Sequence, residues 1–581
     1  AQQELAAFGV SAAGADKFGV AGVANVVHSE NTVEAAISDS AELTNSGDLT
    51  LFAQNGFKVI NIAGGAAGGG TGGIGASVAT TIMKNKTLAY LGRGSLATVL
   101  GTARIEALAR ENLLTISAGG AYGGTAGVAG SSVVNVLNTT THAFVGAGSR
   151  MNLTLTDSAG QNVYVRAEDQ TDLTSVAGAA SYGGTAGIGA AADVGVINKD
   201  TQAYIDSSSG AQTTVNAGNT VGVSAHAEEN LISVAAGFAG GGTVGVAGTA
   251  GVYTIDNITR SFIGEYAQVH TGGNVLVSAL NKNKLLMVSG SAAGSGTASV
   301  GGSGAVVTSN RLTEAYIGSF ADVSALGKHE AINAYTGEFD EEYRDFSGGD
   351  GKVDRPGYAA SDLTGDGTND PIDNESLTKE RSSVAATDQV RGVAVTAVTQ
   401  DHLEEAAVGG AASGTVAVTG AGAVGVIESQ TSAEIRSNAK INQTGENAGV
   451  DQKVLVAAGT DYYSLGIGGA LSGSGGVAVG PGAHVSVVEL GTTASIGDDS
   501  EVRSRGDITV SATTSENILS IAAAGSASAY AAISGAVTVS SLTNRTHAFI
   551  GDRAQVTADR SLSLSALDST KYTTIAGGVA L

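Results

Sequence analysis

The residues best suited to chemistry in this 581-residue chain form an acidic loop between positions 362 and 373. The loop reads Asp-Leu-Thr-Gly-Asp-Gly-Thr-Asn-Asp-Pro-Ile-Asp. Against a twelve-residue calcium loop it supplies oxygens at positions 1, 3, 5, 9 and 12, and glycine at position 6 permits the sharp turn. Thr368 would bind through its backbone carbonyl. The candidate ligands of a possible calcium ion are Asp362, Thr364, Asp366, Thr368, Asp370 and Asp373.

The loop departs from the commonest calcium pattern in one respect. Asp373 stands where glutamate is usual, and in this the loop resembles dockerin-like loops. No amphipathic helices flank it, and a second acidic run, 345–354, is one residue out of register. The alternative is a solvated acidic loop without metal. If calcium binds, we expect it to order the surrounding segment and to take no part in catalysis.

Other residue types offer little for catalysis. Cysteine is absent, which excludes a thiol nucleophile and thiolate-bound zinc. The eight histidines are scattered, with no metal-ligand spacing. The Gly-x-Gly-x-x-Gly runs follow from the glycine content and predict no dinucleotide site. The repeat strands also lack the Asp with Arg or Lys cluster of pectate-lyase-like enzymes. We therefore expect no catalytic residues and a non-enzymatic protein.

A repeat of about 54 residues organises nearly the whole chain. Its anchor is Thr-x-Ala-aromatic-Ile-Gly, as in Thr141–Gly146, Thr313–Gly318 and Thr546–Gly551. The aromatic position recurs at Ala36, Tyr90, Phe144, Tyr204, Phe262, Tyr316, Glu434, Ser495 and Phe549. A fixed period indicates one supersecondary unit stacked on copies of itself. The sequence predicts an all-β parallel β-solenoid of about nine repeats.

Each repeat has three parts. A Gly/Ala/Val segment such as 233–248 comes first, then a turn, often with Asn, leads into the anchor. An alternating strand such as Val275–Ala279 follows. Insertions fall between anchor and strand, which predicts a loop there. A repeat could form three coils of about 18 residues, or one or two larger rungs with long strands.

Two features of the repeat have a structural interpretation. Alternating Gly and Ala leaves almost no side chain on one face, so two sheets could approach closer than the usual spacing of about 10 Å. Asn-x-Thr motifs such as 85–87 and 257–259 match glycosylation sites. We favour turn geometry and hydrogen bonding along the stack as the role of these asparagines.

One segment interrupts the repeats. Residues 330–388 hold 15 acidic and 5 basic residues and two of the three prolines. We predict solenoid repeats over 1–329, an acidic insert over 330–388, and continuing repeats over 389–581. Both ends of the chain fall at the same phase of the repeat, which would allow copies to join head to tail.

Composition excludes several partners. The net charge of −24 opposes binding to nucleic acid and to anionic lipid. The charge-free stretch 59–83 contains too many glycines for a membrane helix. We expect an acidic surface that keeps copies soluble, no nucleic-acid partner, and no insertion of this segment into a membrane.

The repeat resembles the arrays of very large bacterial surface proteins, namely filamentous-haemagglutinin-like and leukotoxin-type filamentous adhesins. The resemblance covers nearly the whole chain outside 330–388, and it implies a secreted parallel β-solenoid at the cell surface. It carries over no functional residue. The function we expect is a stiff extracellular stalk or fibre whose partners are copies of itself, end-to-end or lateral, or a glycan or protein on a host or surface. The alternatives are a head-to-tail filament or sheath subunit and a β-helix polysaccharide-degrading enzyme, which an acidic-basic cluster beside the insert would favour.

Overall fold

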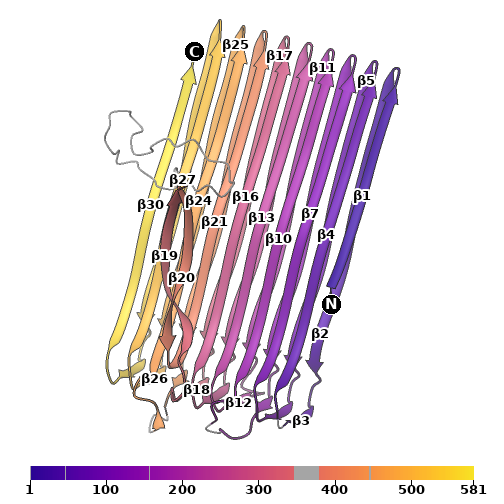
Figure 1. Cartoon of the computed structure of the whole chain (residues 1–581). Coiled ribbons are helices and arrows are strands. Elements are labelled where there is room, and N and C mark those ends of the chain that lie inside the picture. The colour runs from indigo at the N-terminus through magenta and orange to yellow at the C-terminus, as the bar shows by residue number, and fades with distance from the viewer. Residues whose placement is uncertain (1, 46, 156–157, 346–378, 444–446) are drawn as a thin grey trace.

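The computed structural model describes residues 2–45, 47–155, 158–345, 379–443 and 447–581, and it folds into a flat parallel β-solenoid (Figure 1). The predicted all-β solenoid is confirmed. Each repeat forms one coil of three strands. The number of coils per repeat, which the sequence left open, is therefore one. Strands of one sheet pair in parallel without offset, so that Val163 lies beside Ala103 and Val221.

Three sheets run along the stack. Sheet A contains β1 (Gln2–Ala15), β4 (Leu49–Gly69), β7 (Ala103–Gly123), β10 (Val163–Gly183), β13 (Val221–Gly241), β16 (Val275–Ser295), β21 (Gly392–Ser413), β24 (Lys453–Ser474), β27 (Ile508–Ser528) and β30 (Leu562–Ala580). Sheet B contains β2 (Phe18–Ile37), β5 (Gly72–Leu91), β8 (Ala126–Val145), β11 (Ala186–Ile205), β14 (Val244–Ile263), β17 (Ala298–Ile317), β22 (Val416–Ile435), β25 (Val477–Ile496) and β28 (Ala531–Ile550). Sheet C contains the short strands β3 (Glu42–Asn45), β6 (Leu96–Val99), β9 (Arg150–Met151), β12 (Thr214–Ala217), β15 (Gln268–Thr271), β18 (Asp322–Ala325), β23 (Lys440–Ile441), β26 (Glu501–Ser504) and β29 (Gln555–Ala558).

The coil is wide and thin. A strand of twenty residues extends about 66 Å, and nine coils stack to about 43 Å. Sheets A and B face each other over this width, and a tight turn such as Gly70-Thr71 joins them at one edge. We call this edge the arch end. Sheet C closes the opposite edge. No helix within the described ranges is long and apolar enough to cross a membrane.

The anchor motif now has a physical explanation. In β17, Thr313, Ala315 and Ile317 point inward and are fully buried, whereas Tyr316 points outward. Inward threonines of the two sheets form a zigzag of hydroxyl hydrogen bonds, each 2.6–3.0 Å long. The hydroxyls of this zigzag come from Thr313, Thr399, Thr431, Thr460, Thr492, Thr514 and Thr546.

The outward aromatic position builds a ladder on sheet B. Five rings stack with centroids 4.8–4.9 Å apart and nearly parallel planes, in the order Tyr90, Phe144, Tyr204, Phe262 and Tyr316. The guanidinium of Arg436 caps the last ring at 3.4 Å from its centroid. Because the ring faces cover one another, mainly ring edges meet solvent.

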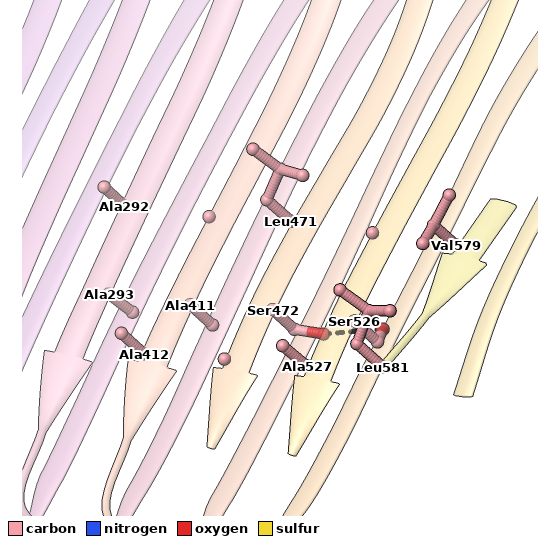
Figure 2. A pocket seen from close by; sticks show the side chains of 13 residues that line it. Ala292, Ala293, Ala411, Ala412, Leu471, Ser472, Ser526, Ala527, Val579 and Leu581 are labelled. Carbon is pink, nitrogen blue, oxygen red and sulfur yellow. Dashed lines mark hydrogen bonds between the residues drawn. The ribbon is translucent and has the colours of Figure 1, made fainter. Parts of the chain in front are cut away.

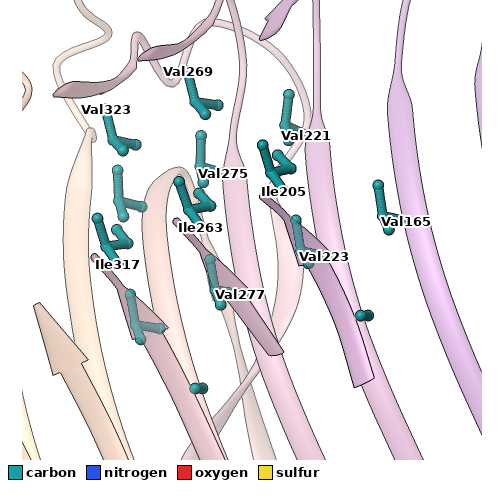
Figure 3. Close-up of a cluster of buried hydrophobic side chains, with 14 of the residues drawn as sticks. Val165, Ile205, Val221, Val223, Ile263, Val269, Val275, Val277, Ile317 and Val323 are labelled. Carbon is teal, nitrogen blue, oxygen red and sulfur yellow. The ribbon is translucent and has the colours of Figure 1, made fainter. Parts of the chain in front are cut away.

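The largest apolar core lies where the three sheets meet. Isoleucines that end sheet B strands, such as Ile263, pack against Val275 and Val277 of sheet A and Val269 of sheet C (Figure 3). The same layer repeats in each coil, so the core is a continuous column of Val, Ile, Leu and Ala along the stack.

The arch end is built by backbone approach. A Cβ added to the inward Gly187 would lie 2.0 Å from the carbonyl oxygen of Gly240 on the opposite sheet, and Gly75 faces Gly120 in the same way at 1.9 Å. Glycine is therefore required here, and the predicted close approach of the two sheets is confirmed.

One local prediction was wrong. The sequence placed asparagines such as Asn85 in a turn before the anchor, but the residue lies inside the continuous strand β5. The tight turns occur instead at the arch end and after the anchor glycine. Asn85 is buried and donates to the carboxylate of Glu111 at 3.3 Å, and Asn257 is buried too. These two motifs are inaccessible to glycosylation in the folded protein.

Candidate functional site

A β-hairpin is the one element of the described ranges that departs from the solenoid. It consists of β19 (Ile332–Asp345) and β20 (Lys379–Val390), which pair antiparallel. It lies on the outer face of sheet A, over β21, β24 and β27 (Figure 1). The segment 346–378, which includes the predicted calcium loop, connects the two strands of the hairpin in sequence.

Apolar side chains hold the hairpin to sheet A. Tyr335, Phe339 and Ala385 pack on the outward Leu280 and Val398. A second cluster near the base joins Ala334 and Val390 to Ala394, Leu455 and Ala457. At the outward position of Leu280 and Val398, other coils carry Gln54, Glu168 and Thr513, but also Leu108 and Leu567. Apolar side chains of neighbouring coils therefore form a seat for the hairpin.

A buried ion pair adds a polar attachment. Arg381 of β20 contacts the carboxylate of Asp461 at 2.5 Å and that of Glu341 at 2.9 Å, and its guanidinium lies 5.7 Å from the centre of the Tyr463 ring. Burial raises the pKa of Asp461, and the arginine opposes this shift. Glu341 also accepts a hydrogen bond from the hydroxyl of Ser515 at 2.7 Å. The hairpin is thus tied to two successive coils.

A charged hollow of about 600 Å³ lies at the foot of the hairpin. It is lined by Glu330, Ala331, Gln389, Arg391, Asp451, Lys453, Asp507 and Arg560. Arg560 contacts Asp451 at 2.7 Å and Arg391 lies 3.7 Å from the same carboxylate. This is the acidic-basic cluster that a polysaccharide-degrading enzyme would need beside the insert. The side chains of Arg391 and Arg560 are both paired with the carboxylate of Asp451, and each is about half exposed.

The predicted calcium ligands Asp362, Thr364, Asp366, Thr368, Asp370 and Asp373 all lie outside the described residues, and so does nearly all of the second acidic run. Among the residues that are described, no three His, Asp or Glu side chains form a group able to hold a metal ion. The calcium hypothesis stays a prediction.

Sequence reasoning missed a line of charged groups between sheets A and B. Lys199 contacts Asp169, and both side chains are fully buried. Arg311 contacts Asp401 at 2.5 Å, and His484 lies 2.9 Å from Glu405. The sequence could have revealed this line of charges. Lys199 lies two residues before the inward Thr201 of its anchor, and in a strand two such residues point to the same side.

These interior charges shift the pKa values of their neighbours. Burial raises the pKa of Glu111 to about 8, and the nearby Asp169 carboxylate adds to the shift. Burial also raises the pKa of Glu229, to about 7, although Lys199 opposes it. Burial alone would lower the pKa of Lys199, but the surrounding carboxylates raise it. The groups are enclosed between the sheets, where their side chains do not reach solvent.

Comparison with known proteins identified no relative. No protein family, no curated protein and no solved structure matches this chain.

Proposed function

We propose that this chain is a rigid structural segment of a bacterial cell-surface protein, in which stacked coils form an extracellular stalk or fibre. The hydrogen-bonded stack is the main support. Three parallel sheets continue through nine coils, and even the turn backbones bond from coil to coil. At the arch end, for example, Gly124 donates to Gly69 at 3.0 Å and Thr125 donates to Thr71 at 2.8 Å. Such a stack resists bending and lengthens by repetition.

In this proposal the hairpin is the recognition element. It stands out from a face that is otherwise built by repetition, and it carries the acidic segment with the calcium-loop pattern. A host or surface glycan or protein is the proposed partner, and calcium would order the segment that contacts it.

Electron microscopy of the purified chain tests the structural role. Discrete slabs of about 43 by 66 Å, with or without calcium, are expected for a stalk segment. Continuous fibres would instead support the head-to-tail filament, and compact globules would contradict both.

A precise deletion tests the role of the hairpin. Adjacent coils connect sheets C and A through three residues, as in Gly272-Gly273-Asn274. Replacing residues 326–392 by Gly-Gly-Asn restores the 54-residue step, and changing Leu280 and Val398 to Thr removes the exposed seat. The slab should keep its shape while binding to the target surface is lost. Binding that survives in the deletion variant would rule out the hairpin as the recognition element.

The charged hollow supports a second candidate, a polysaccharide-degrading enzyme acting on acidic glycans. Arg391 and Lys453 would neutralise uronate carboxylates, and Asp451 or Asp507 would accept a proton. Incubation with polyuronates, followed by detection of new reducing ends or unsaturated products, tests this. Product formation that disappears in Arg391→Ala and Lys453→Ala would favour the enzyme. No turnover by wild type would remove it.

A further inference from the structure

We propose that the outer face of sheet B at the arch end is a lateral interface that binds a second copy of this chain. This deepens the proposed stalk function and rests on it, because it names a surface through which stalks would associate side by side.

The proposed interface carries no charged side chain. It comprises the outward residues from Ala126 to Val136 in β8 and the aligned positions of the other sheet B strands. None of these is Asp, Glu, Lys or Arg; a few are Ser or Thr, and one is His28. Charges begin further along most of these strands, for example at Lys84, Asp256 and Glu428, whereas β8 carries uncharged polar residues such as Asn138 and Thr140 there. Each strand is therefore divided into an apolar half and a polar half on the same side.

The apolar half is corrugated. One ridge consists of β-branched residues, among them Ile74, Val128, Ile188, Val246, Val300 and Val418. A second ridge runs through Val134, Val194 and Val252. Between the ridges lies a groove two outward columns wide. It is lined mainly by glycine, alanine and serine and is interrupted by Val78, Pro481 and Val537.

The groove glycines have no role inside the fold. A Cβ added to Gly22, Gly130, Gly248, Gly302, Gly420 or Gly535 would meet no atom within 4 Å. The inward glycines of the same strands, such as Gly187, leave no room for a Cβ at all. Glycine weakens a strand, and here no internal contact requires it. The open space above these glycines leaves room for a ridge of side chains from another molecule.

The area is sufficient for a stable dimer. Ten residues of strand across nine coils cover about 33 by 43 Å, or roughly 1,400 Å². A stable interface needs about 800 Å² on each partner. Several ridge side chains are substantially exposed in the single chain, for example Ile74 at 47% and Val300 at 44%.

A second copy fits this face better than a lipid surface does. Two faces related by a two-fold axis along the stack would place the ridge of each copy in the groove of the other, as in interdigitated dry sheet interfaces. A lipid surface has no ridge of fixed shape, so a groove lined by glycine would not strengthen its binding. The net charge of −24 repels copies, but the polar halves, which carry the charges of this face, lie away from the contact.

The same edge of sheet A is also apolar but less regular. A hollow of about 480 Å³ lies there between Leu471 and Val579, with small residues such as Ala292 and Ala412 around it (Figure 2). The hairpin occupies another part of that face. The hairpin leaves sheet B uncovered, so the proposal is confined to that sheet.

Sedimentation velocity of the purified chain tests the interface. We expect the wild type to form dimers or larger lateral assemblies with a Kd in roughly the micromolar range or below. Val134→Glu should weaken association at least about tenfold, because it buries a charge. Thr140→Glu, on the same side of the same strand but in the polar half, is the matched control and should associate like wild type.

Filling the groove separates association from folding. The double variant Gly248→Val with Gly302→Val should weaken association at least about tenfold, with an unchanged or higher Tm, because both positions have open space. A wild type that stays monomeric at about 100 μM, or association unaffected by both variants, would overturn the interface. Binding of a monomeric wild type to neutral phosphatidylcholine vesicles would overturn it in favour of lipid. If electron microscopy shows discrete monomeric slabs, the interface is wrong but the stalk function is still supported. Compact globules would contradict both the interface and the stalk function.

Discussion

The ammonium group of Lys199 lies against the carboxylate of Asp169 between the two long sheets, and neither side chain reaches solvent. A carboxylate oxygen of Glu229 in the next coil lies 3.4 Å from the nitrogen of Lys199. The same nitrogen donates a hydrogen bond to the hydroxyl of Thr171 at 2.5 Å. The ammonium group of Lys199 therefore pairs with carboxylates of two neighbouring coils. This ionic contact links the coils in addition to their apolar packing.

Removing this cation should destabilise the protein strongly. Lys199→Met leaves the carboxylates of Asp169 and Glu229 buried without their shared cation, and we expect a loss of about 3–5 kcal/mol in the free energy of unfolding. Chemical denaturation of wild type and variant measures it. Lys84→Met, which breaks an exposed pair with Glu30, is the control and should have no measurable effect. Equal losses in both variants would contradict the buried-pair argument.

Stability should fall as the pH rises from about 4.5 to 8. The pKa of Glu111 is raised from its usual value to about 8, so the folded state holds a proton that the unfolded state releases above pH 4.5. The contribution of this proton is complete below that pH and declines by up to roughly 1.4 kcal/mol per pH unit until the folded pKa is passed.

Melting temperatures at pH 5, 6, 7 and 8 check this pH dependence. Glu111→Gln stays neutral at every pH, so the difference between wild type and variant isolates the contribution of Glu111. A difference that does not change with pH would show that this carboxyl is ionised in the folded protein.

Alanine should distinguish the two kinds of glycine at the arch end. Gly187→Ala forces a Cβ against the carbonyl oxygen of Gly240, and we expect a loss of about 1–3 kcal/mol. Gly130→Ala, where no atom lies within 4 Å, should be neutral or stabilising by about 0.5–1 kcal/mol. Thermal unfolding of both variants measures the contrast. Equal effects would contradict the close approach of the sheets.

The aromatic ladder should contribute more than its separate side chains. Phe144 stacks on both Tyr90 and Tyr204, and Phe144→Ala removes two ring contacts worth about 0.5–1.5 kcal/mol each in addition to area burial. Phe549 occupies the same position beside Ser495, so Phe549→Ala is a control without ring neighbours. The Tm of Phe144→Ala should fall further than that of the control.

Breaking the ion pair of the hairpin should release the hairpin and leave the solenoid intact. Asp461→Asn removes the main partner of Arg381, whose side chain is 2% exposed. Hydrogen exchange in β19 and β20 should accelerate about tenfold or more, while exchange in the long strands stays slow. Asp499→Asn, in an exposed pair with Arg553, is the control. Unchanged exchange in the hairpin would show that apolar contacts alone hold it.

The sequence by itself determined the length of the repeat, which side chains of each strand point inward, and that the repeats form β-strands. In Thr313–Gly318 the alternation of Thr, Ala and Ile already specifies which side is buried, because successive residues of a strand point to opposite faces. The same alternation places Lys199 inside. These properties are local, so they can be read along the chain.

Only the tertiary structure decided the number of coils, the partners of the buried charges and the backbone of the turns. Lys199 meets a carboxylate 30 residues away on the opposite sheet, and no local pattern encodes that distance. Tyr266 and Phe320 adopt left-handed backbone conformations, φ of 59° and 60°, that bulky residues rarely take. Each conformation is held by a hydrogen bond to the next coil and by stacking of the two rings at 4.8 Å. Contacts between coils, and not local preference, impose these features.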